Sequence, residues 1–242
     1  MFGHAATLTQ EMNMRAEAGH MKRLRQTLAS DKRIVISKVF EAYTTTRVLV
    51  MEWIEGTSIR DTAQLQVWRV DRQAVRDALL GAYVKQRLVT GFVHLDPHPG
   101  NLAILPDGNL ALLDFGMVAE YTSDERAAFR ALLQCAFLRD MDGAVRILQS
   151  LEFLQSTSNA EELARGLQGI SKHFTAADLR NLIQKHGFRL EARYMLLIRC
   201  LGMIKTAMTT LTPDETNWTE VLSEHVFPIM LSEANGSQMW FA

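Results

Sequence analysis

The first part of the chain shows helical spacing of its small and apolar positions, followed by extended spacing. Residues 8–29 are rich in charge but carry small and apolar residues at helical intervals, which predicts an amphipathic helix that ends near Ser30. Two segments rich in Val and Ile follow, Ile34–Phe40 and Arg47–Trp53, with three consecutive threonines between them. β-Branched runs separated by a turn predict a pair of strands, and Gly56 ends the second.

The middle of the chain returns to helical spacing and then changes again. Residues 71–90 carry apolar positions on one helical stripe, and we expect Gly91 to end that helix. Leu102–Leu105 and Leu110–Leu113 are short apolar runs around a Pro-Asp-Gly-Asn turn. Proline presets φ, and Gly and Asn accept positive φ, so this pattern predicts a β-hairpin.

From residue 122 onward the apolar spacing is helical. Thr122 and Glu125 have the pattern of a capping box, which favours the start of a helix. A long apolar helix is expected over Leu190–Leu211. Three basic residues interrupt any membrane span, so packing in a protein core is favoured: Arg193, Arg199 and Lys205. The predicted elements give an α+β fold in which helices dominate the C-terminal part.

Composition and charge exclude some classes of function. The 242 residues include 26 Lys and Arg against 27 Asp and Glu, for a net charge of -1. This balance does not favour nucleic acid as a partner. Cys135 and Cys200 both lie within apolar helical patterns, so we expect buried thiols rather than a disulfide.

The polar residues next to the predicted hairpin form the most specific pattern in the chain. The loop His94–Asn101 places Asp96 and Asn101 five positions apart, and Asp114-Phe115-Gly116 begins thirteen positions after Asn101. Because the hairpin reverses the chain, we expect Asp114 to lie beside this loop. The layout is typical of kinase-fold phosphotransferases, which hold the metal ions of a nucleotide and orient an attacking hydroxyl.

Each of these side chains suits one role in phosphoryl transfer. Asp114 follows an apolar run and offers a carboxylate for Mg²⁺, and Asn101 offers a neutral amide oxygen for a second metal ion. Asp96 would act as the base, or would position the substrate hydroxyl. The predicted catalytic residues are therefore Asp96, Asn101 and Asp114, and the cofactors are ATP and Mg²⁺. The alternative interpretation is an ordinary loop, since Asp, Asn, Pro and Gly all favour turns.

Two histidines in the same loop raise the question of zinc. His94 and His98 are four positions apart, which on a helix would form a zinc-binding face. Pro97 and Pro99 do not permit a regular helix here. We therefore expect His94 to be a structural loop residue that hydrogen-bonds the backbone.

The second predicted strand leads into an acidic segment ending at Gly56. In a kinase-like fold this connection lies against the adenine ring, and its backbone from Glu52 to Ile54 would bind the base. The alternative is an ordinary strand end.

These features together resemble the AarF/UbiB family of atypical kinases. The similarity includes the loop His94–Asn101, the run that begins at Asp114, and Glu11–Ala18, which is similar to the family's E-x-D-x-x-x-E-A stretch. The resemblance implies ATP binding, a kinase or ATPase activity, and a link to ubiquinone or other prenyl-lipid biosynthesis. It makes Glu17 the helix glutamate that pairs with an ATP-binding lysine, and it places Glu11 in an acidic pair in which Asn13 stands where the family has Asp.

The resemblance also defines departures from the family. Its K-x-G-Q segment, its Ala-rich nucleotide loop and its lysine strand would precede Glu17, and the sequence does not show them. We therefore expect a protein-kinase-like fold with a mostly helical C-lobe and a truncated N-lobe remnant of one helix and two strands. The expected parts are 1–56 for the N-lobe remnant, 57–234 for the C-lobe and 235–242 for a flexible tail. Nucleotide affinity would suffer unless another chain completes the N-lobe.

Two alternatives remain for the function. One is a non-catalytic truncated fragment that serves as an interaction module. The other is a small-molecule phosphotransferase of the aminoglycoside or choline kinase type, since these proteins share the H-x-D-x-x-x-x-N loop. The expected partners are a nucleotide and an unknown phosphoryl acceptor or lipid. The expected location is the cytoplasm, and peripheral membrane association follows from the resemblance alone.

Overall fold

The computed structural model describes residues 13–154, 160–168, 181, 185–186, 188–214, 221 and 223–230. The chain divides into two compact units, the first comprising Met1–Glu120 and Arg199–Ala242, and the second Tyr121–Ile198. These units do not test the predicted boundary between an N-lobe and a C-lobe at residue 56, which stays a prediction.

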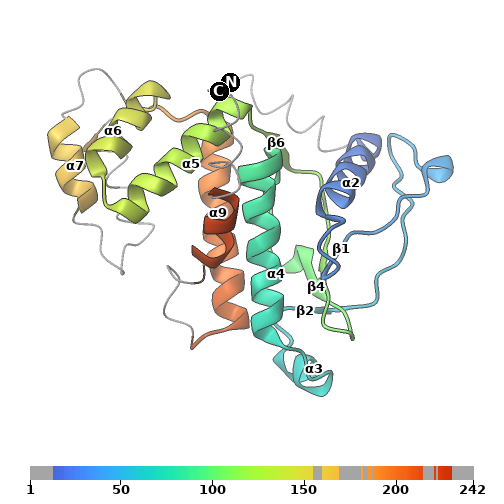
Figure 1. Ribbon diagram of the computed structural model, residues 1–242. Helices are drawn as coiled ribbons and strands as arrows, with labels where there is room; N and C mark the ends of the chain where they lie inside the picture. The colour runs from blue at the N-terminus through green and yellow to red at the C-terminus, as the bar shows by residue number, and fades with distance from the viewer. Residues whose placement is uncertain are drawn as a thin grey trace, which may run out of the picture. The chain divides into compact units, whose positions relative to one another are not determined.

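The elements of the first unit are short strands among helices (Figure 1). They are α2 (Met14–Leu28), β1 (Ile34–Val35), η1 (Glu41–Tyr43), β2 (Thr57–Ser58), α3 (Thr62–Val67), α4 (Arg72–Val84), η2 (Lys85–Thr90), β3 (Phe92–His94), η3 (Pro99–Asn101), β4 (Leu102–Ile104), β5 (Leu110–Leu112) and β6 (Val118–Glu120). The second unit contains α5 (Ser123–Leu138), α6 (Met141–Ser150) and α7 (Ala160–Gln168). The residues of α9 (Ala192–Leu211) from Arg199 onward belong to the first unit.

Helix α2 is capped by Asn13, a residue that departs from the pattern of the family it resembles. The Asn13 side chain accepts hydrogen bonds from the backbone N–H groups of Arg15 and Ala16, so it caps the helix. The buried face of α2 is apolar and consists of Ala18, Met21, Leu24 and Leu28. The predicted helix is thus confirmed over Met14–Leu28. Glu11 and the rest of residues 1–12 lie outside the described residues, as does the predicted tail 235–242.

A four-stranded sheet with the order β1-β5-β4-β2 forms the main sheet of the first unit. The predicted hairpin is confirmed: β4 and β5 pair antiparallel, with Ala103 opposite Ala111. Gly108 has a φ of 84° in the turn, and the Leu105 N–H donates to the Asn109 carbonyl at 2.9 Å. The turn residues therefore act through the backbone geometry expected of them.

The two strands predicted before the hairpin are wrong in extent. Within Ile34–Phe40 the strand β1 covers two residues, which pair with β5, and Arg47–Trp53 contains no strand among its described residues. A single bridge joins Val39 to Met51. The Thr44 hydroxyl lies within hydrogen-bonding distance of the backbone of both segments and takes the place of further ladder bonds. β-Branched residues alone did not make a sheet here, because strand propensity depends on neighbouring strands.

A second sheet, which the sequence pattern did not predict, joins β3 to β6. Phe92 pairs with Glu120, and His94 pairs with Val118. The ladder extends by one bond, in which the Leu95 N–H donates to the Met117 carbonyl at 3.0 Å. This pairing ties the segment before Asp96 to the segment after Asp114.

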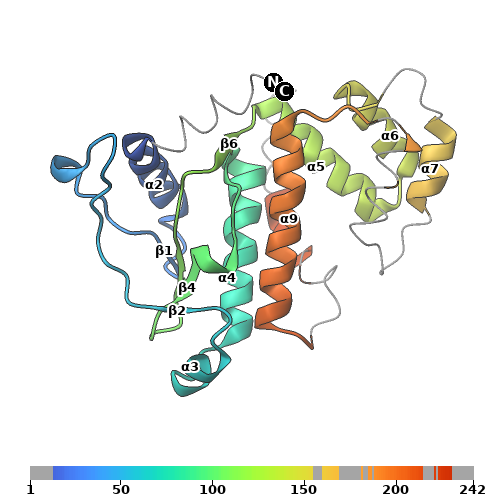
Figure 2. The ribbon, with the colours of Figure 1, turned by 180° about the vertical axis from the view of Figure 1, so that it is seen from behind.

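Helix α4 leads into β3 and carries the core of the first unit. In Figures 1 and 2, α4 lies between the strands and α9. Asp71 caps its start, and η2 continues it with wider π-type turns. Gly91 ends the helical segment with a left-handed φ of 72°, and its N–H donates to the Gln86 carbonyl. The predicted helical span and its stop at Gly91 are confirmed.

The second unit has its own small core and a confirmed helix cap. The Thr122 side chain and the Glu125 side chain each bond the other's backbone N–H, which completes the capping box of α5. The Tyr194 hydroxyl donates to Glu125, and Arg193 forms an ion pair with the same carboxylate at 2.9 Å. The buried apolar cluster consists of Val145, Leu154, Leu163 and Ala164.

Helix α9 is long and apolar enough to cross a membrane by length and composition alone, and within the described ranges it is the one helix that meets this test. A core helix meets the same test. Cys200 and Ala207 are fully buried, whereas Arg199 and Lys205 are exposed. A buried stripe beside an exposed charged face favours a helix that packs in a protein core.

Two glycines provide a test of this backbone. Gly91→Ala should lower the free energy of unfolding by about 1–2 kcal/mol, because an added Cβ strains a left-handed residue. Gly19→Ala is the matched control. Gly19 lies in α2 with open space around it, so alanine there should raise the stability by about 0.5–1 kcal/mol. Denaturant titration measures both, and equal effects in the two variants would contradict the assigned geometry.

Candidate functional site

The loop Asp96–Asn101 and the loop at Asp114 are joined by backbone hydrogen bonds on both sides. Before the first loop, the Leu95 N–H donates to the Met117 carbonyl at 3.0 Å. After it, the Leu113 N–H donates to the Asn101 carbonyl at 2.9 Å. These bonds cross between the segments that flank the three predicted catalytic residues. The structure therefore brings the loops of Asp96, Asn101 and Asp114 side by side.

Asn101 holds Asp96 directly. Its Nδ2 donates to the Asp96 backbone carbonyl at 3.0 Å and approaches Asp96 Oδ2 at 3.4 Å. Pro99 opens the short helical turn η3, and the exposed His98 ring accepts the Gly100 N–H. Because the Asn101 nitrogen faces Asp96, its amide oxygen is the atom left to bind a cation.

Asp114 lies at a strained and exposed position. Its φ is 56°, an uncommon value for a residue with a Cβ. Its Oδ1 accepts the Gly116 N–H at 3.1 Å, which stabilises the turn. Backbone strain of this kind costs on the order of 1 kcal/mol or more and is found preferentially at functional sites. The turn keeps the Asp114 carboxylate at the surface rather than in the core.

Helix α2 holds the residue after Asp114 through two backbone contacts. Glu17 Oε1 accepts the Phe115 N–H at 3.1 Å, and His20 Nδ1 donates to the Phe115 carbonyl at 2.9 Å. Glu17 and His20 are three positions apart on one face of the helix. The structure therefore places Glu17 at the site. In residues 13–154, no Lys or Arg forms an ion pair with it, so the lysine contact implied by the resemblance is not seen there.

His94 lies in the core beneath the loop, in keeping with the structural role expected of it. It is fully buried, shares a hydrogen bond of 2.8 Å with the Tyr83 hydroxyl, and packs on the Phe115 ring at a centroid distance of 5.3 Å. Its backbone N–H donates to Gln86 Oε1 at 2.9 Å. Burial lowers the pKa of His94, and hydrogen bonding with the Asp114 backbone opposes this shift in part. A neutral imidazole therefore supports the loop.

The predicted adenine-binding segment is less engaged with the site. The Glu52 N–H already donates to the Lys38 carbonyl at 2.8 Å, and its carboxylate accepts the Lys38 N–H. Trp53 is 88% exposed, and Ile54 is half-buried. No hydrogen bond or ion pair of the described residues joins Glu52 or Ile54 to the two loops. The binding of a base by the backbone from Glu52 to Ile54 stays a prediction.

The donor set suits a metal ion that arrives with phosphate. Within the described ranges, no cluster of three or more His, Cys, Asp or Glu could hold a metal ion by itself. Asp114 and Asn101 offer two oxygens, and Mg²⁺ typically binds one or two protein oxygens together with water and substrate phosphates. The residues present therefore fit Mg²⁺ bound with a nucleotide.

Sequence reasoning missed two residues that contact the site. His20 binds the Phe115 carbonyl, and Arg199 of α9 binds Asp96 Oδ1 at 3.2 Å. His20 could have been found from its spacing to Glu17 on α2. Arg199 is a charged residue in an otherwise apolar run, which is a signal for a specific partner.

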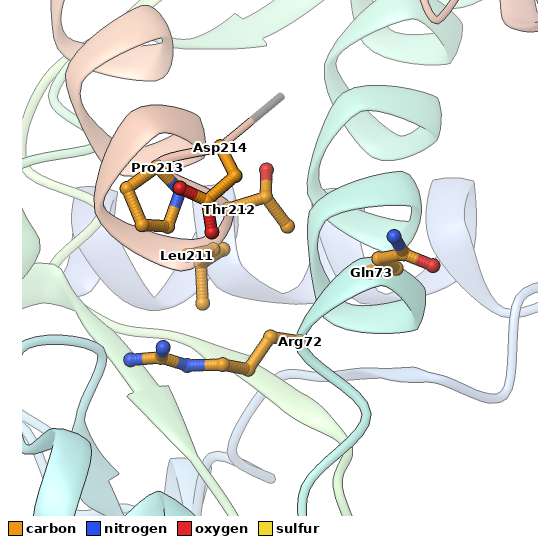
Figure 3. A pocket seen from close by; sticks show the side chains of 6 residues that line it. All are labelled: Arg72, Gln73, Leu211, Thr212, Pro213 and Asp214. Carbon is orange, nitrogen blue, oxygen red and sulfur yellow. The ribbon is translucent and has the colours of Figure 1, made fainter.

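A separate pocket lies at the other end of α4 from the Asp96–Asn101 loop. Its lining comes from the first turn of α4 and from the end of α9 with the residues that follow: Arg72, Gln73, Leu211, Thr212, Pro213 and Asp214 (Figure 3). The pocket has a volume of about 340 Å³. It includes none of the predicted site residues.

Comparison with known proteins gives a family match over residues 4–148, to the model described as the ABC1 atypical kinase-like domain. The chain is 28% identical over 213 residues to Protein ACTIVITY OF BC1 COMPLEX KINASE 3, chloroplastic, from Arabidopsis thaliana, covering 83% of this chain and 30% of that protein. It is 26% identical over 242 residues to the uncharacterized protein sll1770 of Synechocystis sp., covering 95% of this chain and 41% of that protein. The chain thus spans about a third of the length of such relatives.

A solved structure also resembles the fold. The chain in the complex of Rv3197 with erythromycin from Mycobacterium tuberculosis is 21% identical, with a TM-score of 0.57. The similarity covers 84% of this chain and 55% of that chain. At this level of identity, the likeness concerns the fold.

The buried imidazole gives the stability a pH dependence of known sign. The unfolded state holds His94 at its ordinary pKa of about 6.5, and the folded state lowers that pKa. The folded protein therefore binds fewer protons, and its stability is full above about pH 6.5 and falls as the pH drops toward the folded-state pKa. Denaturant titration between about pH 7.5 and 5.5 should show a shallower decline for His94→Asn than for the unchanged chain. His98→Asn removes an exposed imidazole and should keep the full slope; the reverse order would contradict the prediction.

Proposed function

This chain belongs to the ABC1 atypical kinase-like family, also known as AarF/UbiB, and from that premise we propose that it binds ATP with Mg²⁺ and transfers or hydrolyses the γ-phosphoryl group. The family match covers more than half of the 242 residues. The fold is α+β and kinase-like, as the sequence predicted.

The observation that carries the proposal is the backbone linkage of the Asp96 loop to the Asp114 loop. Phosphoryl transfer depends mainly on positioning and charge neutralisation, so side chains of the right type in one place matter more than any covalent step. Mg²⁺ would supply neutralisation of the phosphate oxygens. Asp114 and Asn101 would hold that ion through their oxygens, while Asp96 would orient the attacking hydroxyl and accept its proton.

The contacts of α2 support the same role for Asp114. Glu17 and His20 bind the N–H and carbonyl of Phe115, so the strained backbone at Asp114 is held from the next residue. A positioned carboxylate loses little freedom when it binds a metal ion. Glu17 has no cationic partner in the described part of the chain. A segment or chain that supplies a lysine there would raise the affinity for nucleotide.

The biological role is proposed from family membership. Three similar proteins carry the name activity of BC1 complex kinase, and all three are described as chloroplastic. We propose that the activity supports prenyl-lipid biosynthesis, with an alcohol or lipid as phosphoryl acceptor. A small-molecule alcohol remains the alternative acceptor. Phosphotransferases of the aminoglycoside or choline kinase type share the spacing from His94 to Asn101.

Binding of Mg²⁺ and ATP tests the proposal directly. Calorimetric titration of ATP should show binding that requires Mg²⁺, and Asp114→Ala should weaken it at least tenfold, because a metal-binding carboxylate is lost. Asp107→Asn is the matched control. It removes a carboxylate from the turn of the same hairpin, away from the two loops, and should leave the affinity unchanged.

The outcomes separate the candidate functions. Absence of Mg²⁺-dependent binding in the unchanged chain would favour a non-catalytic interaction module. Binding that is equal in Asp114→Ala and Asp107→Asn would place the nucleotide elsewhere. If binding requires Mg²⁺ and Asp114, a screen of candidate alcohols for phosphorylated products would identify the acceptor. It would distinguish a lipid alcohol from an aminoglycoside or choline.

A further inference from the structure

Asp96 has a second partner, which comes from a distant part of the chain. Arg199 of α9 forms an ion pair with Asp96 Oδ1 at 3.2 Å, and the side chains are 56% and 26% exposed, respectively. The Asn101 Nδ2 donates to Asp96 Oδ2 and to the Asp96 backbone carbonyl. The carboxylate is therefore held at both oxygens by groups from two different elements.

The neighbouring residue fixes the register of α9 at this point. Cys200 is fully buried, and its thiol approaches the His94 carbonyl at 3.6 Å. Ile204, Ala207 and Leu211 continue the buried stripe of the helix. Figure 2 shows α9 running beside α4, the helix that leads into β3 and the catalytic loop. Arg199 therefore starts from a backbone that is anchored to the base of the loop.

The energetics favour a positional role over a stabilising one. An ion pair that is this exposed contributes about 0–1 kcal/mol to folding, because water and salt screen it. The loop His94–Asn101 and the run Leu113–Val118 contain no Lys or Arg. Arg199 is therefore a cation that reaches the predicted base from outside the two motifs, and it partly offsets the negative charge that the two carboxylates present to a polyphosphate.

We propose that Arg199 is a positioning residue for Asp96, an inference that rests on the proposed phosphotransfer function. The guanidinium holds Oδ1, and the Asn101 amide holds the other side. Together they keep the carboxylate in one rotamer, aimed at the attacking oxygen. Loss of this constraint affects the chemical step more than nucleotide binding, since misplacement of a reacting group by about 1 Å can cost up to a hundredfold in rate.

The test measures ATP hydrolysis, in which water serves as the acceptor. Water adds to the γ-phosphorus, the bond from that phosphorus to the ADP oxygen breaks, and the proton of the water passes through Asp96 to solvent. The products are ADP and inorganic phosphate. Arg199→Ala should lower kcat at least tenfold while KM for ATP changes less than about threefold. Arg199→Lys retains a cation and should recover part of kcat.

Two further variants make the result specific. Lys205→Ala removes an exposed cation from the same helix, away from the loop, and should match the unchanged chain. In the Asp96→Asn background, Arg199→Ala should have little additional effect, because the group that it positions is already lost. Thermal unfolding of each variant verifies that it folds.

Each outcome either supports or overturns the inference. A kcat for Arg199→Ala that equals or exceeds that of the unchanged chain overturns it, and so does a loss that persists in the Asp96→Asn background. A change confined to KM would make Arg199 a nucleotide-binding group instead. If the unchanged chain shows no hydrolysis that depends on Asp96, the proposed function fails together with this inference. If hydrolysis depends on Asp96 but is unchanged in Arg199→Ala, only the inference about Arg199 is rejected.

Discussion

The antiparallel pairing of β3 with β6 is the constraint on which the site depends. It fixes the chain before Asp96 against the chain after Asp114. The β4–β5 hairpin pairs the segment after Asn101 with the segment before Asp114. Two short ladders thus convert a separation along the sequence into proximity in space. The strands cover three residues each, so the geometry rests on backbone hydrogen bonds rather than on a large sheet.

Two helices support the loops that this pairing creates. α2 holds Phe115 through Glu17 and His20, and α9 reaches Asp96 through Arg199. The contacts to Phe115 involve its backbone, so they constrain the direction of the chain whatever side chain follows Asp114. His94, neutral and buried, fills the space beneath both loops. The polar groups at the surface therefore lie above a buried, hydrogen-bonded base, a support that helps to position functional side chains.

Features set by local chemistry could be predicted from the sequence, and features set by tertiary approach could not. The hairpin turn at Gly108 and the helix stop at Gly91 follow from which residues tolerate positive φ, and both were predicted. The strands expected over Ile34–Phe40 and Arg47–Trp53 failed because they have few neighbours to complete a ladder. The pairing of β6 with β3 and the ion pair of Arg199 with Asp96 depend on which distant segments lie together in the fold. The local sequence pattern does not specify these partners.

Paramagnetic broadening of backbone amide NMR signals by Mn²⁺ in the presence of ATP tests whether the two loops share one metal site. Mn²⁺ replaces Mg²⁺ at oxygen ligands, and its unpaired electrons broaden the signals of nearby nuclei. If the two loops share one metal ion, the amide signals of Asp96, His98, Gly100 and Asn101 should broaden together with those of residues 114–116. Signals that stay sharp in both loops while others broaden, for instance those around Arg72 and Asp214, would contradict it.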